Sequence, residues 1–434
     1  MKSKFIKSTF ILLIGGLVTK ILGMVIKIIM TRILGTEGIG TYMLIMPTFS
    51  LLISFAQLGF PVAISKLVAE ETKNNKNLVF STIPISLLLN FIIIFILIFS
   101  SNFISNDLLH ESNTRFGLIC IGFVLPFISI SSILRGYFFG KQKMFPHVIS
   151  NIVEDVVRLI IIFIGVPIFL LKGLDYAIAF IILSNIVSEL TSILILFFFL
   201  PKNFKIEKKD IIPNKNNLID VFSISIPTTI SRLIGNIGYF FEPIILTNIL
   251  LYLNYSSSFI TREYGIINGY VLPMLLLPSF FTMAISQALI PVISKIYVLK
   301  DMANVKRKIK QAIYFSLLVG IPVTIVLFIY PDVFLKLIYN TDEGINYVKI
   351  LAPIFLLQYI QSPLSASLQA MGKAKISMYG TLIGILIKTS TLALFTSLRI
   401  EMWGLVISTI FGIIFVTCYD LWNIKKLDNE VDPK

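Results

Sequence analysis

The stretch MPTFSLLISFAQLGFPV, residues 46–62, has a counterpart in LPSFFTMAISQALIPV, residues 277–292. Both place a Pro and a Phe near the start, a Gln further on and Pro-Val at the end. Three more pairs occur in the same order in each half: TKILG at 19–23 with SRLIG at 231–235, GKQK at 140–143 with GKAK at 372–375, and Arg158 with Lys388. This ordered series of matches predicts that the chain consists of two halves built on one plan.

The composition is that of a protein dissolved in lipid. Of the 434 residues, 56% are hydrophobic and 14% are charged, against about 25% charged residues in a typical soluble protein. The net charge of +14 comes from Lys and Arg in short loops between apolar runs, where membrane proteins carry them. Cys120 and Cys418 lie inside apolar runs, so neither a disulfide framework nor a metal cluster is expected. A soluble enzyme and a nucleic-acid partner are excluded.

Twelve apolar runs reach the length of about 20 residues that a membrane span needs. They are continuous rather than alternating, which predicts helices instead of barrel strands. The first run follows a basic start without a cleavage site, so we interpret it as a retained span. The expected spans are 8–32, 40–65, 78–100, 117–140, 148–171, 176–199, 218–249, 264–294, 311–330, 346–371, 376–397 and 403–423. The predicted fold class is an all-α polytopic membrane protein.

The loops predict the orientation and the division of the chain. Lys and Arg gather at the N-terminus, in every second loop and at the C-terminus, so both termini are expected in the cytoplasm. The alternate loops hold few cations: Arg32, Arg115, Lys172, Arg262, Lys336 and Arg399. The basic loop 201–217 is expected to link an N-lobe at 1–200 to a C-lobe at 218–434. Such a parallel repeat of six helices predicts two lobes related by a pseudo-two-fold axis, as in secondary transporters with a central site.

Several charges lie deep within the expected spans, where each costs about 2.5–3.5 kcal/mol on the insertion scale. At a rise of 1.5 Å per residue, four cations lie about 15–21 Å from the start of their spans. We expect these four to bind substrate: Lys20, Arg158, Arg232 and Lys388. Lys27 and Arg135 lie nearer to helix ends, and their side chains are expected to snorkel to the membrane surface.

The acids within the spans are candidates for ion pairs or for carrying a coupling ion. Glu154 and Arg158 are four residues apart and share a helix face, which predicts an internal ion pair. Glu189 and Glu242 either pair with cations across the bundle or carry a coupling proton or sodium ion. The sequence leaves these alternatives open.

Lys20 and Arg232 occupy equivalent positions of the repeat. A pseudo-two-fold axis would place them opposite each other across a central cavity, where two cations favour an anionic substrate. Guanidinium groups in particular bind phosphate in a bidentate manner. The alternative is that the two cations pair with Glu189 or Glu242 as structural elements.

Sequence signals for catalysis are missing. The chain has no G-x-x-x-x-G-K-[ST] phosphate loop, so it is not expected to hydrolyse ATP. His110 and His147 lie in loops expected on opposite sides of the membrane and form no catalytic or metal pair. We therefore expect no catalytic residue, no metal and no cofactor, with transport coupled to a proton, to sodium or to the membrane potential.

Several motifs along the chain match a known family. They are ILGTEGIGTY at 33–42, LGFP at 58–61, LRGYFFG at 134–140 with IVEDVVR at 152–158, and SRLIG at 231–235 between Ile226-Pro227 and Glu242-Pro243. On these motifs the chain resembles the stage V sporulation protein B family. That family belongs to a superfamily with multidrug and toxin extruders, polysaccharide-unit flippases and lipid II flippases.

The resemblance implies alternating access between two six-helix lobes in the cell membrane, moving an isoprenoid-pyrophosphate-linked saccharide to the outer leaflet. Basic residues of the first and eighth helices line the cavity of the lipid II flippases; Lys20 matches the first by motif, while Arg232 is inferred from the repeat. An acid that follows in those flippases is replaced here by Ile26-Lys27, and their two additional C-terminal helices have no counterpart, which counts against lipid II itself. Cell-wall synthesis or sporulation proteins are the implied partners.

Two other functions are compatible with the same composition. A cation-coupled multidrug exporter of the same fold would line its site with acids, whereas the deepest charges here are basic. A non-transporting scaffold of a sporulation complex would tolerate neutral residues at Lys20 and Arg232. A membrane enzyme is not favoured, because it would need convergent acids or histidines near one membrane face and the sequence shows none.

Overall fold

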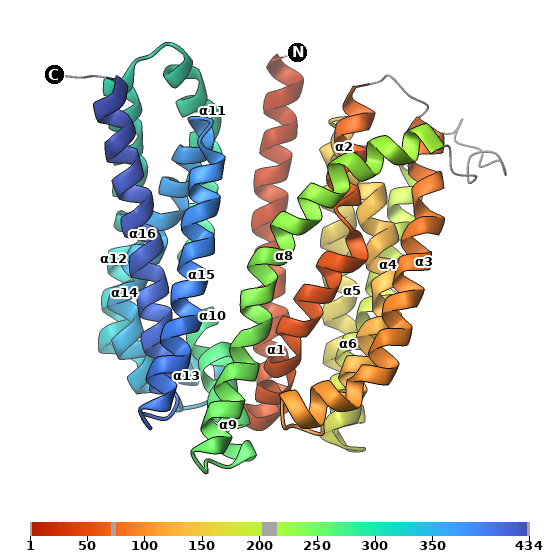
Figure 1. The fold of residues 1–434 in the computed structure, drawn as a ribbon, viewed down its shortest axis with the longest axis vertical. Helices are drawn as coiled ribbons and strands as arrows, with labels where there is room; N and C mark the ends of the chain where they lie inside the picture. The colour runs from red at the N-terminus through yellow and green to blue at the C-terminus, as the bar shows by residue number, and fades with distance from the viewer. Residues whose placement is uncertain (1, 71–74, 202–214, 432–434) are drawn as a thin grey trace. The chain divides into compact units, whose positions relative to one another are not determined.

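The computed structural model describes residues 2–70, 75–201 and 215–431, and this part of the chain is built of helices without a β-strand (Figure 1). The apolar runs explain this result, because a helix satisfies its own backbone hydrogen bonds in a lipid environment.

The first six expected spans lie in α1 to α6. The first span and the larger part of the second belong to α1, and the second span ends in α2. The helix α1 is interrupted at Gly35 by a non-helical φ of 69° and ψ of −173°. The bounds are α1 Lys2–Gln57, α2 Phe60–Ala69, α3 Asn75–Asn102 with the π-helix η1 Phe103–Leu108, α4 Thr114–Gly140, α5 Met144–Leu170 and α6 Leu174–Phe198.

The other six expected spans lie in α8 to α16. The span expected at 264–294 is divided among several short pieces and α11. The bounds are α8 Lys215–Tyr252, α9 Ser257–Gly265, η2 Ile266–Val271, α10 Leu272–Leu275, α11 Ser279–Val298, α12 Met302–Ile329, α13 Pro331–Tyr339, α14 Ile345–Ala370, α15 Ala374–Ser397 and α16 Trp403–Val431.

Every expected span therefore coincides with helical segments of the structure. Among the described residues, 8 helices are long and apolar enough to cross a membrane by length and composition alone. The predicted fold class, an all-α polytopic membrane protein with twelve spans in two halves, is confirmed.

The two halves share one pattern of internal packing. In the first half, α4 packs against α2, α3 and α6, while α5 packs against α6. In the second half, α14 packs against α11, α12 and α16, while α15 packs against α16. Since α4 and α14 each hold the fourth span of their half, the repeat in the sequence is also a repeat in the packing.

Internal contacts divide the chain into two compact units, Met1–Pro243 and Ile244–Lys434. The division falls within α8, whose Asn236 donates hydrogen bonds to Ser54 Oγ at 2.6 Å and to the Ser50 carbonyl oxygen at 3.3 Å. The first part of α8 is thereby tied to α1. The linker expected at 201–217 stays a prediction, because most of it lies outside the described residues.

A sharp corner at Leu58 and Gly59 separates α1 from α2. Both residues have a left-handed backbone, with φ of 42° and 61°. Glycine tolerates this conformation because it has no Cβ, and a Cβ at Gly59 would lie 2.6 Å from the carbonyl oxygen of Ser225 in α8. Pro61 suits the first turn of α2, where a backbone N–H has no helical partner. The corner brings α1, α2 and α8 into contact.

We expect Gly59→Ala to destabilise the protein by about 1–3 kcal/mol, because it adds backbone strain and a clash with α8. Gly16→Ala is the matched control, since a Cβ at Gly16 would meet nothing within 4 Å. Thermal unfolding of the purified protein in detergent should show a lower midpoint for Gly59→Ala and no loss for Gly16→Ala. Equal midpoints for the two variants would contradict this account of the corner.

Candidate functional site

A cavity of about 390 Å³ lies within the first unit, bounded by α1, α5, α6 and α8. Its wall is mostly apolar and holds a small set of polar groups. The lining residues are Gly23, Ile26, Lys27, Met30, Tyr42, Met43, Met46, Phe49, Ser50, Arg158, Ile162, Ile181, Asn185 and Tyr239. Such a lining is typical of a site that binds a small molecule or a headgroup.

The charged groups of this lining are both cations. Lys27 comes from α1 and Arg158 from α5, and none of the described lining residues is an acid. Neutral polar groups complete the wall: Tyr42, Ser50, Asn185 and Tyr239. Two cations with hydroxyl and amide groups around them suit an anionic ligand that also carries hydroxyls.

Arg158 is held in place by carboxylates on its own helix. Glu154, four residues earlier, forms an ion pair with it, and Asp155 Oδ1 lies 3.5 Å from its Nη1. Arg158 Nε also donates to Ser188 Oγ of α6 at 3.4 Å. The ion pair predicted between Glu154 and Arg158 is therefore present.

Arg135 of α4 completes a buried ion network. Its guanidinium pairs with the second oxygen of Glu154, donates to Ser192 Oγ at 2.8 Å and lies 3.7 Å from Glu189 Oε2. The Glu154 and Glu189 side chains are only 9% and 7% exposed. Because buried carboxylates are costly unless paired, the network fixes α4, α5 and α6 relative to one another.

The expectation that Arg135 snorkels to the membrane surface is wrong. Its side chain points inward because Glu154 and Glu189, on the two neighbouring helices, would otherwise be buried with fewer partners. Lys27, for which snorkelling was also expected, lines the cavity. The direction of such a side chain depends more on the acids of adjacent helices than on its distance from a helix end.

The other candidate residues fall in different environments. Lys20 is exposed on α1, and Arg232 is exposed on α8, where its Nη1 donates to Gln57 Oε1 at 3.3 Å. Glu242 is buried in α8. Lys388 lies in the second unit, packed next to Gly412 of α16. Their roles in binding substrate or a coupling ion stay predictions.

Sequence reasoning missed part of the cavity wall. Asn185 of α6 lines the cavity and lies at helical spacing with Ser188, Glu189 and Ser192. Of these four only Glu189 was predicted, and period analysis could have found the others. Tyr42 and Tyr239 carried no such signal, because aromatic residues are common throughout this chain.

Removal of Arg135 should destabilise the first unit strongly. Arg135→Ala leaves Glu154 and Glu189 buried with fewer partners, and breaking a buried pair in this way typically costs about 3–5 kcal/mol. The control is Arg262→Ala, which removes an ion pair with Glu343 in which the Arg262 side chain is 57% exposed; exposed pairs contribute about 0–1 kcal/mol. Thermal unfolding in detergent measures both. Similar midpoints for the two variants would mean that the network does not hold the helices together.

Comparisons with known proteins agree with this structure. The family model described as "Polysaccharide biosynthesis protein" matches residues 5–297, and the MatE family model matches residues 243–393. Stage V sporulation protein B of Bacillus subtilis (strain 168) is 37% identical over 98% of this chain and 84% of its own length. Lipid II flippase MurJ of the same organism is 22% identical over 98% of this chain and 83% of its own length.

The fold is also found among solved structures. An inward-facing multidrug resistance MATE family transporter of the MOP superfamily superposes with a TM-score of 0.74 at 15% identity, covering 95% of each chain. At this identity the likeness establishes the fold alone, and the family model and the 37% identical relative establish the family. This multi-pass membrane protein belongs to the polysaccharide biosynthesis protein family, is similar to stage V sporulation protein B and has the fold of MOP-superfamily transporters.

Proposed function

We propose that this protein is a flippase that moves an anionic, isoprenoid-pyrophosphate-linked saccharide across the cytoplasmic membrane by alternating access. The observation that carries the proposal is the cavity of the first unit, whose charged lining residues are Lys27 and Arg158. A cavity of this polarity attracts phosphate and disfavours cationic drugs.

Lys20 and Arg232 extend this basic character along α1 and α8 of the same unit. Both are exposed and lie in segments expected to span the membrane, where a charge is tolerated if it faces a water-filled cavity. We assign them to capture of the pyrophosphate, and Lys388, in the second unit, is a further candidate for binding substrate. Arg158 is already fixed by Glu154 and Asp155, so it acts as a rigid part of the wall.

The neutral groups of the cavity suit the saccharide. Tyr42, Asn185 and Tyr239 offer hydroxyl and amide groups, together with aromatic faces. Hydroxyl-rich ligands are bound by such groups through hydrogen bonds that fix their orientation. Peptidoglycan or spore-cortex precursors and other polysaccharide units are the substrates that this set accommodates.

A cation-coupled multidrug exporter is the second candidate, favoured by the match of residues 243–393 to the MatE family model. The acids of the first unit argue against it. Glu154 and Asp155 contact Arg158, and Glu154 also pairs with Arg135, so these carboxylates are engaged with arginines. In our proposal Glu189 and Glu242 are the candidates to carry a coupling ion.

Binding of the headgroup should depend on the exposed cations. We expect Lys20→Ala/Arg232→Ala to bind an undecaprenyl-pyrophosphate-linked saccharide at least about tenfold more weakly than wild type, because each lost charged hydrogen bond costs about 1.5–3 kcal/mol. Lys141→Ala/Lys143→Ala, in the loop after α4, removes the same charge outside the spans and should bind like wild type. Titration of the purified protein in nanodiscs measures all three affinities. Equal affinities, or no binding by wild type, would overturn the proposed substrate class.

The orientation proposed from the loop charges places both termini in the cytoplasm. Cys120 is buried and Cys418 is exposed, so a Cys120→Ala/Cys418→Ser background removes the native thiols. In intact cells, a membrane-impermeant maleimide should label Ser256→Cys, in the loop between α8 and α9, but not Lys373→Cys, in the loop between α14 and α15. Labelling with the opposite pattern would reverse the topology.

A further inference from the structure

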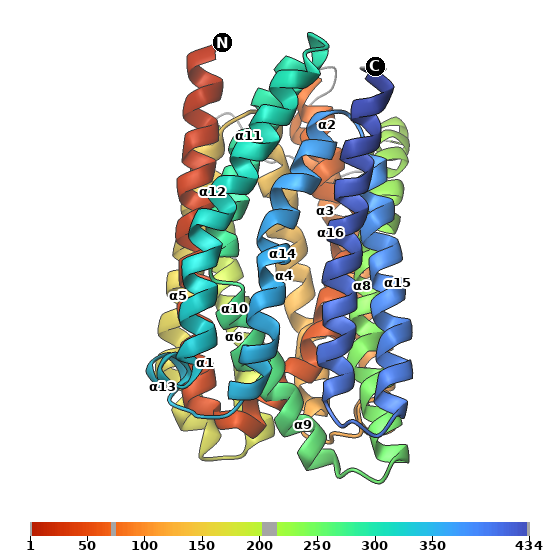
Figure 2. The same cartoon turned by 90° about the vertical axis from the view of Figure 1, so that its left-hand side faces the viewer.

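We propose that an apolar groove on the second unit is a binding site for an anionic phospholipid of the surrounding bilayer. The groove has a volume of about 480 Å³ and is bounded by α12, α14 and α16. Figure 2 shows these three helices running alongside one another in the second unit. The site lies outside the cavity assigned to transport and shares none of its residues.

The floor of the groove is part of the hydrophobic core. Val305 and Ile309 of α12 and Leu364 of α14 are buried there and belong to one core cluster. At the rim, Leu421 and Trp422 of α16 are 40% and 60% exposed. Exposed large apolar groups above an apolar floor suit the acyl chain of a lipid.

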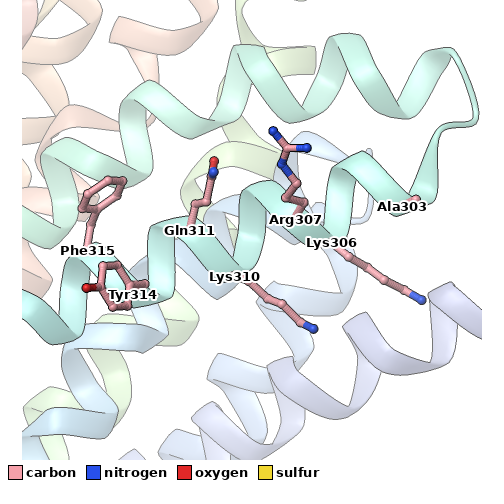
Figure 3. A pocket seen from close by; sticks show the side chains of 7 residues that line it. All are labelled: Ala303, Lys306, Arg307, Lys310, Gln311, Tyr314 and Phe315. Carbon is pink, nitrogen blue, oxygen red and sulfur yellow. The ribbon is translucent and has the colours of Figure 1, made fainter.

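Three lysines line the same groove: Lys306 and Lys310 from α12, and Lys425 from α16. Figure 3 shows the Lys306 and Lys310 side chains extending from the same side of α12, away from Arg307 and Gln311. None of the described residues lining the groove is acidic. A phosphate between the lysines of the two helices would accept charge-assisted hydrogen bonds from both helices.

The position of the lysines relative to the apolar floor selects a phospholipid over a free phosphate. All three stand near one end of the second unit, at the start of α12 and the end of α16. The loop charges predict that this end faces the cytoplasm, whose leaflet is rich in anionic lipids. Basic pockets between helices on that side are suited to acidic headgroups, while the groove takes the chain.

Tryptophan fluorescence tests this site directly. The chain has 2 Trp residues, so a Trp403→Phe background leaves Trp422 at the groove as the reporter. The protein is reconstituted into phosphatidylcholine vesicles with equal mole fractions of phosphatidylglycerol or phosphatidylcholine that carry brominated acyl chains. We expect brominated phosphatidylglycerol to quench Trp422 about twofold more, because it is held by the lysines. Equal quenching by the two lipids would overturn the proposal.

A charge-matched control separates the site from general attraction to a basic surface. Lys306→Gln/Lys310→Gln/Lys425→Gln should abolish the preference for phosphatidylglycerol. Lys295→Gln/Lys300→Gln/Lys373→Gln removes as many cations from loops and helix ends near α11 and α14 and should keep it. An equal loss of the preference in both variants would overturn the proposal. A competition with unlabelled lipids gives a second test. If unlabelled undecaprenyl phosphate relieved the quenching better than unlabelled phosphatidylglycerol, the groove would bind an isoprenoid lipid and the proposal would be overturned. Because neither readout involves transport, the result is independent of the proposed function.

Discussion

The pairing of buried charges is the constraint on which the first unit depends. Glu154 lies between Arg135 and Arg158 and forms ion pairs with both, and Glu189 lies 3.7 Å from Arg135. Within an apolar bundle none of these groups can remain without a partner at low cost, so three helices are held in one arrangement. That arrangement presents Arg158 to the cavity in a fixed position, and Lys27 of α1 supplies the second cation of the lining.

The second half repeats the helix packing of the first, but different side chains make the buried polar contacts. At the offset of 230 residues that relates Arg158 to Lys388, the counterpart of Arg135 is Ser365. Ser365 of α14 donates a hydrogen bond to the fully buried Asp420 of α16, as Arg135 of α4 does to Ser192 of α6. The contact between the fourth and sixth spans is thus retained with a neutral donor in place of a guanidinium. The helix breaks differ as well, because Pro278 stands at the start of α11 whereas its counterpart Pro47 lies inside α1.

Much of the fold could be predicted from the sequence, because a bilayer imposes a length and a composition on each span. The twelve spans follow from the length of the apolar runs, and the repeat follows from matching motifs in the two halves. The Glu154–Arg158 pair follows from a spacing of four residues along one helix. The orientation of Arg135 did not follow, because it depends on which acids lie on neighbouring helices. The corner at Gly59 was likewise hidden, since it depends on the approach of α8 rather than on local propensity. The helices could therefore be predicted from the sequence, whereas the contacts between helices could not.

The central claim is that a basic cavity in a transporter fold selects a phosphate-bearing saccharide lipid. Translocation tests it most directly, in vesicles that contain the purified protein and a fluorescent undecaprenyl-linked saccharide with or without the pyrophosphate. A membrane-impermeant reductant destroys the fluorescence of the label in the outer leaflet only. The loss of fluorescence therefore reports transfer of the lipid between leaflets. We predict rapid transfer of the pyrophosphate-linked lipid and, for the neutral analogue, transfer no faster than in protein-free vesicles. Equal rates for the two lipids, or no transfer of either above the protein-free rate, would contradict the claim.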